Sequence, residues 1–169
     1  WVLPLTGNRT PRPYLATATN EGQGRLSPDN RWMAYVSDES GQSEVYVQPF
    51  PASGAKWQIS TAGGRFPRWR SDGKEILYAT PSGAEVAFSA VEIRIVGTTF
   101  EAGAPKPLFK RQLGNGGNLA NVNGGAIGAT SPYAVSADLQ RFLSLTPSAD
   151  AAPDSPITVV VNWPALLKK

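Results

Sequence analysis

The sequence predicts an all-β fold, a fragment of a β-propeller with about three four-stranded antiparallel blades. Three observations support this prediction: a turn motif that recurs along the chain, a first interval that matches the length of one blade, and strand-like alternation between the copies. With 17 Gly and 15 Pro spread through 169 residues, the chain leaves little room for long helices.

The recurring motif is a polar turn that joins two apolar runs, and it occurs at residues 26–36, 69–79 and 135–143. Each copy carries one Asp, namely Asp29, Asp72 and Asp138. An Asp side chain can accept hydrogen bonds from the free backbone N–H groups of a tight turn. Because the three carboxylates recur at equivalent turns, we expect a structural role for them rather than a catalytic or metal-binding one.

The residue after each Asp often takes a positive φ in turns of this kind. Gly73 adopts such a φ at no steric cost, and Asn30 tolerates it. Leu139 is expected to avoid it, so we expect the third turn to differ in geometry from the other two.

The spacing of the copies predicts how the chain is divided. Asp29 and Asp72 lie 43 residues apart (72 − 29), close to the roughly 40–45 residues of a four-stranded blade. Asp138 follows Asp72 by 66 residues (138 − 72), and an insertion rich in Gly and Asn accounts for the surplus. We therefore expect the end of a preceding blade at 1–19, blades at 20–61 and 62–112, the insertion at 113–130 and a final blade at 131–169.

Between the turns, β-branched and aromatic residues alternate with polar ones, as half-buried strands require. Residues 44–48, Glu-Val-Tyr-Val-Gln, are the clearest example. The expected strands are 1–5, 14–18, 24–26, 32–37, 43–48, 56–60, 66–70, 75–79, 86–95, 107–110, 133–136, 141–145 and 157–162.

The composition excludes several kinds of site. The chain contains neither Cys nor His, which removes disulfides, thiol nucleophiles, Cys/His zinc sites and a Ser-His-Asp relay within this chain. The net charge of +3 comes from 16 basic and 13 acidic residues without a long basic run, so no nucleic-acid surface is expected. No apolar run approaches the roughly 18 residues of a membrane span. Because the chain starts at Trp1 without a start Met, we expect it to be a piece of a longer protein.

Three arginines, Arg65, Arg68 and Arg70, crowd one expected strand. Arg68 and Arg70 are two residues apart and should share a face, whereas Arg65 should point elsewhere. The innermost strands of a propeller line its channel, so an anion-binding site competes here with the simpler alternative of a solvated strand face.

Most Trp and Tyr side chains are expected to pack between blades, since Tyr35 and Tyr78 share the offset of the repeat. Trp1 and Trp57 have no clear counterpart and are expected to be exposed, which makes Trp57 a candidate binding residue.

Two further patterns have simpler explanations. The carboxylates of Asp38, Glu39 and Glu44 gather at one expected hairpin, where solvated turn residues are ordinary and paired acid catalysis is the alternative. The Gly-rich insertion lacks the Gly-Lys-Ser/Thr of a phosphate loop.

Several stretches are similar to known propellers. Residues 27–30 and 32–35, and Trp69 before residues 72–75, resemble the WD-repeat-like propeller repeat of the TolB family. Residues 20–24, 44–51 and 155–163 more closely resemble the C-terminal propellers of acidobacterial-type bacterial Ser/Thr protein kinases. The resemblance implies a non-catalytic module that lies outside the cytoplasm, in the periplasm or beyond, with a kinase domain N-terminal to it. The chain itself carries none of the kinase motifs.

We therefore expect a binding module for a protein or a small ligand, without a cofactor, rather than an enzyme. A regulatory propeller that gates a prolyl-oligopeptidase-like hydrolase and a TolB-like envelope scaffold are the alternatives. An open arc of blades leaves two apolar faces, so two copies are a candidate pair for completing a ring. The terminal Lys168 and Lys169 suggest a natural end, which speaks against a hydrolase domain downstream.

Overall fold

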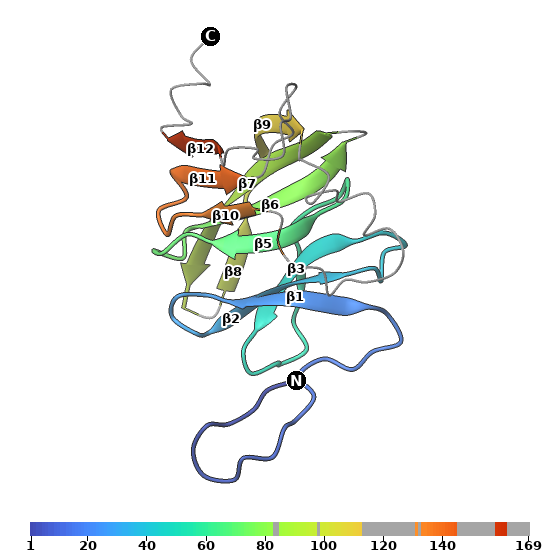
Figure 1. Ribbon diagram of the computed structural model, residues 1–169. Coiled ribbons are helices and arrows are strands. Elements are labelled where there is room, and N and C mark those ends of the chain that lie inside the picture. The colour runs from blue at the N-terminus through green and yellow to red at the C-terminus, as the bar shows by residue number, and fades with distance from the viewer. Residues whose placement is uncertain (83–84, 98, 113–130, 132, 145–157, 162–169) are drawn as a thin grey trace, which may run out of the picture.

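The computed structural model describes residues 1–82, 85–97, 99–112, 131, 133–144 and 158–161. All regular elements among these residues are strands, and they form antiparallel sheets that stack on one another (Figure 1). The predicted fold class, an all-β propeller fragment of about three blades, is confirmed. The division of the chain into blades at the stated residues stays a prediction. The predicted insertion at residues 113–130 lies outside the described residues.

Three sheets make up the fold. The first has the order β1-β2-β3-β4, the second β5-β6-β7-β8 with β9 also paired to β7, and the third β10-β11-β12. The strands of the first sheet are β1 (Glu21–Leu26), β2 (Trp32–Ser37), β3 (Glu44–Pro49) and β4 (Trp57–Gln58). Those of the second are β5 (Arg65–Trp69), β6 (Glu75–Ser82), β7 (Glu85–Val96), β8 (Thr99–Ala102) and β9 (Lys106–Gln112). The third contains β10 (Tyr133–Val135), β11 (Arg141–Ser144) and β12 (Thr158–Val161).

Strand β6 lies between two cores, which explains the apolar run at its residues 76–79. Because successive side chains of a strand point to opposite faces, Ile76 and Tyr78 pack toward the first sheet and Leu77 and Ala79 toward the third. All four side chains are buried. The sheets therefore pack face to face, as the blades of a propeller do.

The second sheet contains a strand that the sequence did not predict. Strand β7 pairs with β9 through its first half, and its last residues, from Ile93 to Val96, pair with β8. The resulting β7–β8 hairpin brings Phe100 into the core of the first sheet. The centroid of the Phe100 ring lies 5.0 Å from the ring centroid of Trp32 and 5.1 Å from that of Trp57.

The inner edge strands β1 and β5 both contain a bulge at equivalent places. The register shifts between Gly22 and Arg25 in β1 and between Arg65 and Arg68 in β5. Within these bulges Gln23 and Phe66 have φ values of 56° and 55°, in the left-handed region. The Phe66 N–H donates to the Gln23 side-chain oxygen over 2.6 Å, so the two bulges are bonded to each other.

The three turns share one geometry, and the expectation that the third would differ is wrong. Leu139 has a φ of 56°, as Asn30 (57°) and Gly73 (71°) do at the equivalent places. Each of these residues donates its N–H to the carbonyl three residues earlier over 2.9 Å. The Leu139 side chain is buried in the core between the second and third sheets. Burying a Leu contributes about 1.5–3 kcal/mol, which offsets the roughly 1–2 kcal/mol cost of the left-handed backbone.

Neither of the two strands expected near the N-terminus forms. The first 20 residues contain one isolated bridge, between Val2 and Arg12. Pro4, Pro11 and Pro13 lack the N–H that a strand ladder needs. This segment instead contacts the first sheet through Tyr14, whose hydroxyl donates to the Pro49 carbonyl over 2.7 Å.

Candidate functional site

The inner strands β1, β5 and β10 lie next to one another and are joined by side-chain hydrogen bonds. The Trp69 indole N–H donates to the Arg25 carbonyl over 3.0 Å, which joins β5 to β1. The Tyr133 hydroxyl donates to the Phe66 carbonyl over 2.6 Å, which joins β10 to β5. Figure 1 shows the three strands following one another along the front of the molecule, as the channel-lining strands of a propeller do.

Two arginines occupy equivalent positions on these inner strands. Arg25 of β1 and Arg68 of β5 lie on the same side of their bulges and are separated by the interval of the repeat. Burial and the positive charge of Arg25 lower the pKa of the Arg68 guanidinium. The guanidinium carbon of Arg68 lies 5.8 Å from the centroid of the Tyr133 ring, which is a cation–π contact.

No ion pair joins Arg25 or Arg68 to a carboxylate among the residues that the structure describes. Their hydrogen bonds run to carbonyls of their own strands, from Arg25 to Gly24 over 3.3 Å and from Arg68 to Pro67 over 3.1 Å. Two like charges near each other repel, and an anion between them would relieve this repulsion. This arrangement can therefore bind a carboxylate or a phosphate.

The structure does not bring the three predicted arginines together. Arg65 is buried at the start of β5, where it donates to the Ser43 hydroxyl over 2.9 Å and burial lowers its pKa. Arg70 lies just past the end of β5 and bonds Asp72 and Glu75, each over 2.8 Å. The hydrogen bond to Asp72 raises the pKa of Arg70. Of the three, Arg68 alone lies beside a second arginine, and Arg25 was not among the predicted residues.

The turns of the first and second sheets and the β7–β8 hairpin enclose a groove of about 1060 Å³, which we call the turn groove. Its walls are residues 27–29, Arg31, residues 70–75, residues 92–96 of β7, and Lys106. Arg31 closes one part of it by donating to the Gly97 carbonyl over 3.1 Å. Glu92 lies 3.5 Å from Arg94 and 3.9 Å from Lys106. Most charges of the turn groove are thus already paired within it.

Each turn Asp accepts two hydrogen bonds through one carboxylate oxygen. Asp29 accepts from the Ser27 hydroxyl over 2.5 Å and from the Arg31 N–H over 3.1 Å. Asp72 accepts from the Arg70 side chain and the Lys74 N–H, and Asp138 from the Ser136 hydroxyl and the Gln140 N–H. These contacts support the structural role that we propose for the three carboxylates.

The same bonds determine how the turn carboxylates titrate. The hydrogen bond from Arg70 holds the pKa of Asp72 below its usual value, and the bond from Ser136 does the same for Asp138. At Asp29 partial burial acts in the opposite direction, but the bonds from Ser27 and Arg31 outweigh it and lower the pKa. All three carboxylates are therefore held in the charged form.

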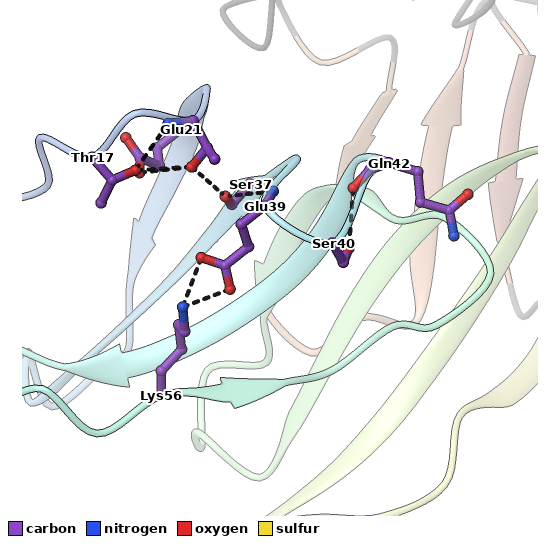
Figure 2. Close-up of polar contacts among 8 residues, drawn as sticks. Thr17, Glu21, Ser37, Glu39, Ser40, Gln42 and Lys56 are labelled. Carbon is purple, nitrogen blue, oxygen red and sulfur yellow. Dashed lines mark hydrogen bonds and ion pairs between the residues drawn. The ribbon is translucent and has the colours of Figure 1, made fainter.

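The carboxylates near the β2–β3 hairpin each bond a different set of partners. Glu39 binds the Lys56 ammonium with both of its oxygens (Figure 2). Asp38 accepts from the Asn20 backbone and amide N–H groups over 2.9 and 2.6 Å. Glu44 is buried and accepts from the Gly63 N–H over 2.8 Å and from the Ser60 hydroxyl. Each of the three carboxylates is occupied by its own structural contacts.

Figure 2 also shows how the N-terminal segment is held on the first sheet. The Thr17 hydroxyl donates to the Glu21 carboxylate, and the Thr19 and Ser37 hydroxyls lie 3.3 Å apart. These contacts border the outer face of this sheet, where the rings of Tyr35 and Tyr46 stack with centroids 5.9 Å apart. Burial raises the pKa of Tyr35.

Trp57, the predicted aromatic binding residue, is half-buried and packs against Trp32 and Phe100. Its expected exposure is not found, whereas Trp1 is 85% exposed. The role of Trp57 in binding stays a prediction. Trp163 lies outside the described residues.

The site on the inner strands consists of Arg25, Arg68 and Tyr133, of which Arg25 and Tyr133 were not identified as site residues from the sequence. A signal for Arg25 was present, because it precedes Arg68 by the interval between the Asp residues. Tyr133 carried no such signal, since it reaches Arg68 only through the stacking of the second and third sheets.

Within the described part of the chain, no group of three or more acidic side chains is placed to hold a metal ion. The described residues also contain no helix with the length and apolar character needed to cross a membrane.

No family model matches the chain, and no curated protein matches it. Two solved structures that it resembles are TolB proteins. A protein assigned as TolB from Agrobacterium tumefaciens has a TM-score of 0.43 and 19% identity, over 53% of this chain and 33% of that one. TolB from Acinetobacter baumannii has a TM-score of 0.42 and 15% identity, over 88% of this chain and 43% of that one. The chain thus spans less than half the length of either TolB structure.

Proposed function

We propose that this chain is a non-catalytic binding module whose inner strands hold an anionic group between Arg25 and Arg68. The observation that carries the proposal is the pair of arginines at equivalent positions on β1 and β5, without a carboxylate partner among the described residues. Arginine presents a planar fork of N–H donors that suits carboxylate and phosphate oxygens. Tyr133 packs against Arg68 and limits its rotation.

The test uses inorganic phosphate and succinate as probes in isothermal titration calorimetry at low ionic strength. The variants are Arg25→Met and Arg68→Met, with Arg111→Met as the control, because Arg111 is an exposed strand arginine of β9. Each inner-strand substitution should weaken binding of the probe about tenfold, as the loss of a charge-assisted hydrogen bond does. The control should bind as the unmodified chain does. Equal affinity in all four proteins, or no binding of either probe, would contradict the proposal.

The context of the module is a finer proposal that the sequence resemblance supports. We propose that the chain belongs to the part of a Ser/Thr-kinase-like receptor outside the cytoplasm. A kinase domain and a membrane span encoded upstream of Trp1 would agree with this. A long α/β domain encoded downstream of Lys169 would favour the gating propeller of a hydrolase instead.

The pairing of two copies into a ring stays a proposal of its own. The outer face of the first sheet carries Tyr35 at the repeat position of Tyr78, which packs between the first and second sheets. Tyr35 and Tyr46 are already buried within one chain, so a second copy would pack against the residues that cover these two rings. Light scattering tests this association, and a monomer at high micromolar concentration contradicts it.

A further inference from the structure

The β7–β8 hairpin has one unpaired backbone edge, and this edge lies along the turn groove. Strand β6 pairs with β7 as far as the pair Glu75–Glu92, and the Ile93 N–H donates to the Lys74 carbonyl over 2.8 Å. Beyond Ile93 the strand continues to Val96, paired on its other edge with β8 alone. The backbone of Ile95 therefore extends past the end of its neighbour β6.

The direction of the Ile95 backbone groups follows from the ladder. Glu92 accepts a hydrogen bond from the Gly103 N–H over 2.8 Å, so its carbonyl points toward the β8 side. Backbone groups of successive residues in a strand point to opposite edges. Arg94 therefore shares the direction of Glu92, and Ile95 shares the direction of Ile93, away from β8. The Ile93 carbonyl and both backbone groups of Ile95 face the turn groove, and no backbone partner from the β6 side is found for them among the described residues.

An edge of this kind is a template for one more strand. The side chains of Ile93 and Ile95 point into the core of the first sheet, so they hold the edge in place rather than cover it. Figure 1 shows the β7–β8 hairpin extending past the second sheet beside the strands of the first. The turn groove thus has backbone donors and acceptors along one wall.

The charges of the turn groove indicate which strand would fit. Its four carboxylates are occupied: Asp29 and Asp72 by their turn contacts, Glu75 by Arg70, and Glu92 by Arg94 and Lys106. The Lys74 side chain, in contrast, is exposed and has no ion pair among the described residues. The uncompensated charge of the turn groove is positive, and it stands beside the end of the free edge.

From this geometry we propose that the turn groove binds an extended acidic peptide, which pairs as a strand with Ile93 and Ile95 and places a carboxylate on Lys74. The backbone supplies affinity through hydrogen bonds, and Lys74 selects for negative charge. This site is separate from the inner-strand arginines, so it does not depend on the function proposed above.

The probe is a hexapeptide, Thr-Val-Glu-Val-Asp-Thr, that carries fluorescein on its N-terminus and an amide at its C-terminus, with binding followed by fluorescence anisotropy. A set of six peptides carries one N-methyl group each, at successive positions. Strand pairing uses N–H donors on alternate residues only, and the edge offers two acceptors, the Ile93 and Ile95 carbonyls. Methylation should therefore weaken binding about tenfold at two positions that lie two residues apart, and little at the other four. Lys74→Ala should weaken binding about threefold, as the loss of an exposed ion pair does. Lys110→Ala, which removes an exposed lysine of β9, should leave it unchanged.

The outcomes separate the alternatives. No binding of the hexapeptide to the unmodified protein overturns the proposal. Binding that is equally insensitive to methylation at every position overturns strand pairing, since the contacts would then be made by side chains alone. An equal loss in Lys74→Ala and Lys110→Ala overturns the placement of the carboxylate, because it would reflect net charge rather than a contact.

Discussion

Truncation of Phe100 tests directly whether the β7–β8 hairpin completes the core of the first sheet. Phe100 is 3% exposed, and its ring contacts Trp32 and Trp57. Replacing a buried Phe by Ala costs about 3–5 kcal/mol, through the lost burial and the cavity that remains. Because Phe100 comes from a short edge strand that can move inward, we expect the lower part of this range, about 3 kcal/mol.

Chemical denaturation followed by Trp fluorescence measures this loss, since Trp32 and Trp57 lie at the altered site. In a thermal scan the same loss corresponds to a decrease in Tm of about 6–12 °C for a domain of this size. Val96→Ala is the control, because Val96 lies on the same hairpin and is 71% exposed; its effect should stay within about 0.5 kcal/mol. A loss below about 1 kcal/mol for Phe100→Ala would refute the packing of the hairpin.

Three further predictions concern the turns and the contact between Ser60 and β3. Asp72 has a lowered pKa in the folded chain, so the unfolded chain binds the proton more readily. The charged Asp72 therefore stabilises the fold above about pH 4, and this stabilisation is lost as the pH falls toward the folded pKa. Asp72→Asn should therefore flatten the decrease in unfolding free energy, measured by urea denaturation, as the pH falls below about 4. An unchanged slope would contradict this. Gly73→Ala should lower the free energy of unfolding by about 1–2 kcal/mol, because Ala is strained at the φ of 71° found there. The added Cβ makes no clash, since its nearest neighbour would be an atom of Pro28 at an ordinary 3.8 Å. A neutral result would argue against the left-handed turn. Ser60→Ala should lower the free energy of unfolding by about 2 kcal/mol in the same assay. The buried Glu44 carboxylate loses a hydrogen-bond donor, and the Val45 N–H loses its acceptor at 2.8 Å. A loss no greater than that of an exposed serine would argue against this contact.

The fold was predictable where the repeat determines it. The turn copies and the alternation at residues 44–48 predict strands that the structure contains, because burial on one or both faces requires that pattern. Strand β8 was not predicted, since residues 99–102 have no counterpart in the first blade. The left-handed φ of Leu139 was not predicted either, because local preference opposes it and the core between the second and third sheets outweighs that preference.

The candidate sites were predictable only in part, for a related reason. Arg68 was expected to share a face with Arg70 in a regular strand, but β5 ends before Arg70, whose side chain bonds Asp72 and Glu75. The bulge at Phe66 lies before Arg68 and separates Arg65 from it. A bulge moves one residue out of register and changes the direction of its neighbours. The turn groove depends on the hairpin, so no local pattern predicts it.

The contact of Phe100 with the first sheet sets an order for assembly during synthesis. The ribosome releases the chain from its N-terminus, and domains generally fold as they emerge. Strands β1 to β4 can pair once residue 58 is free, but Trp32 and Trp57 keep one side open until residue 100 follows. The aromatic core of the first sheet is therefore complete only after Phe100 of the second sheet has been synthesised. A blade cut from this chain at the boundary of the repeat would lack the ring that completes it, so the blades are not interchangeable units.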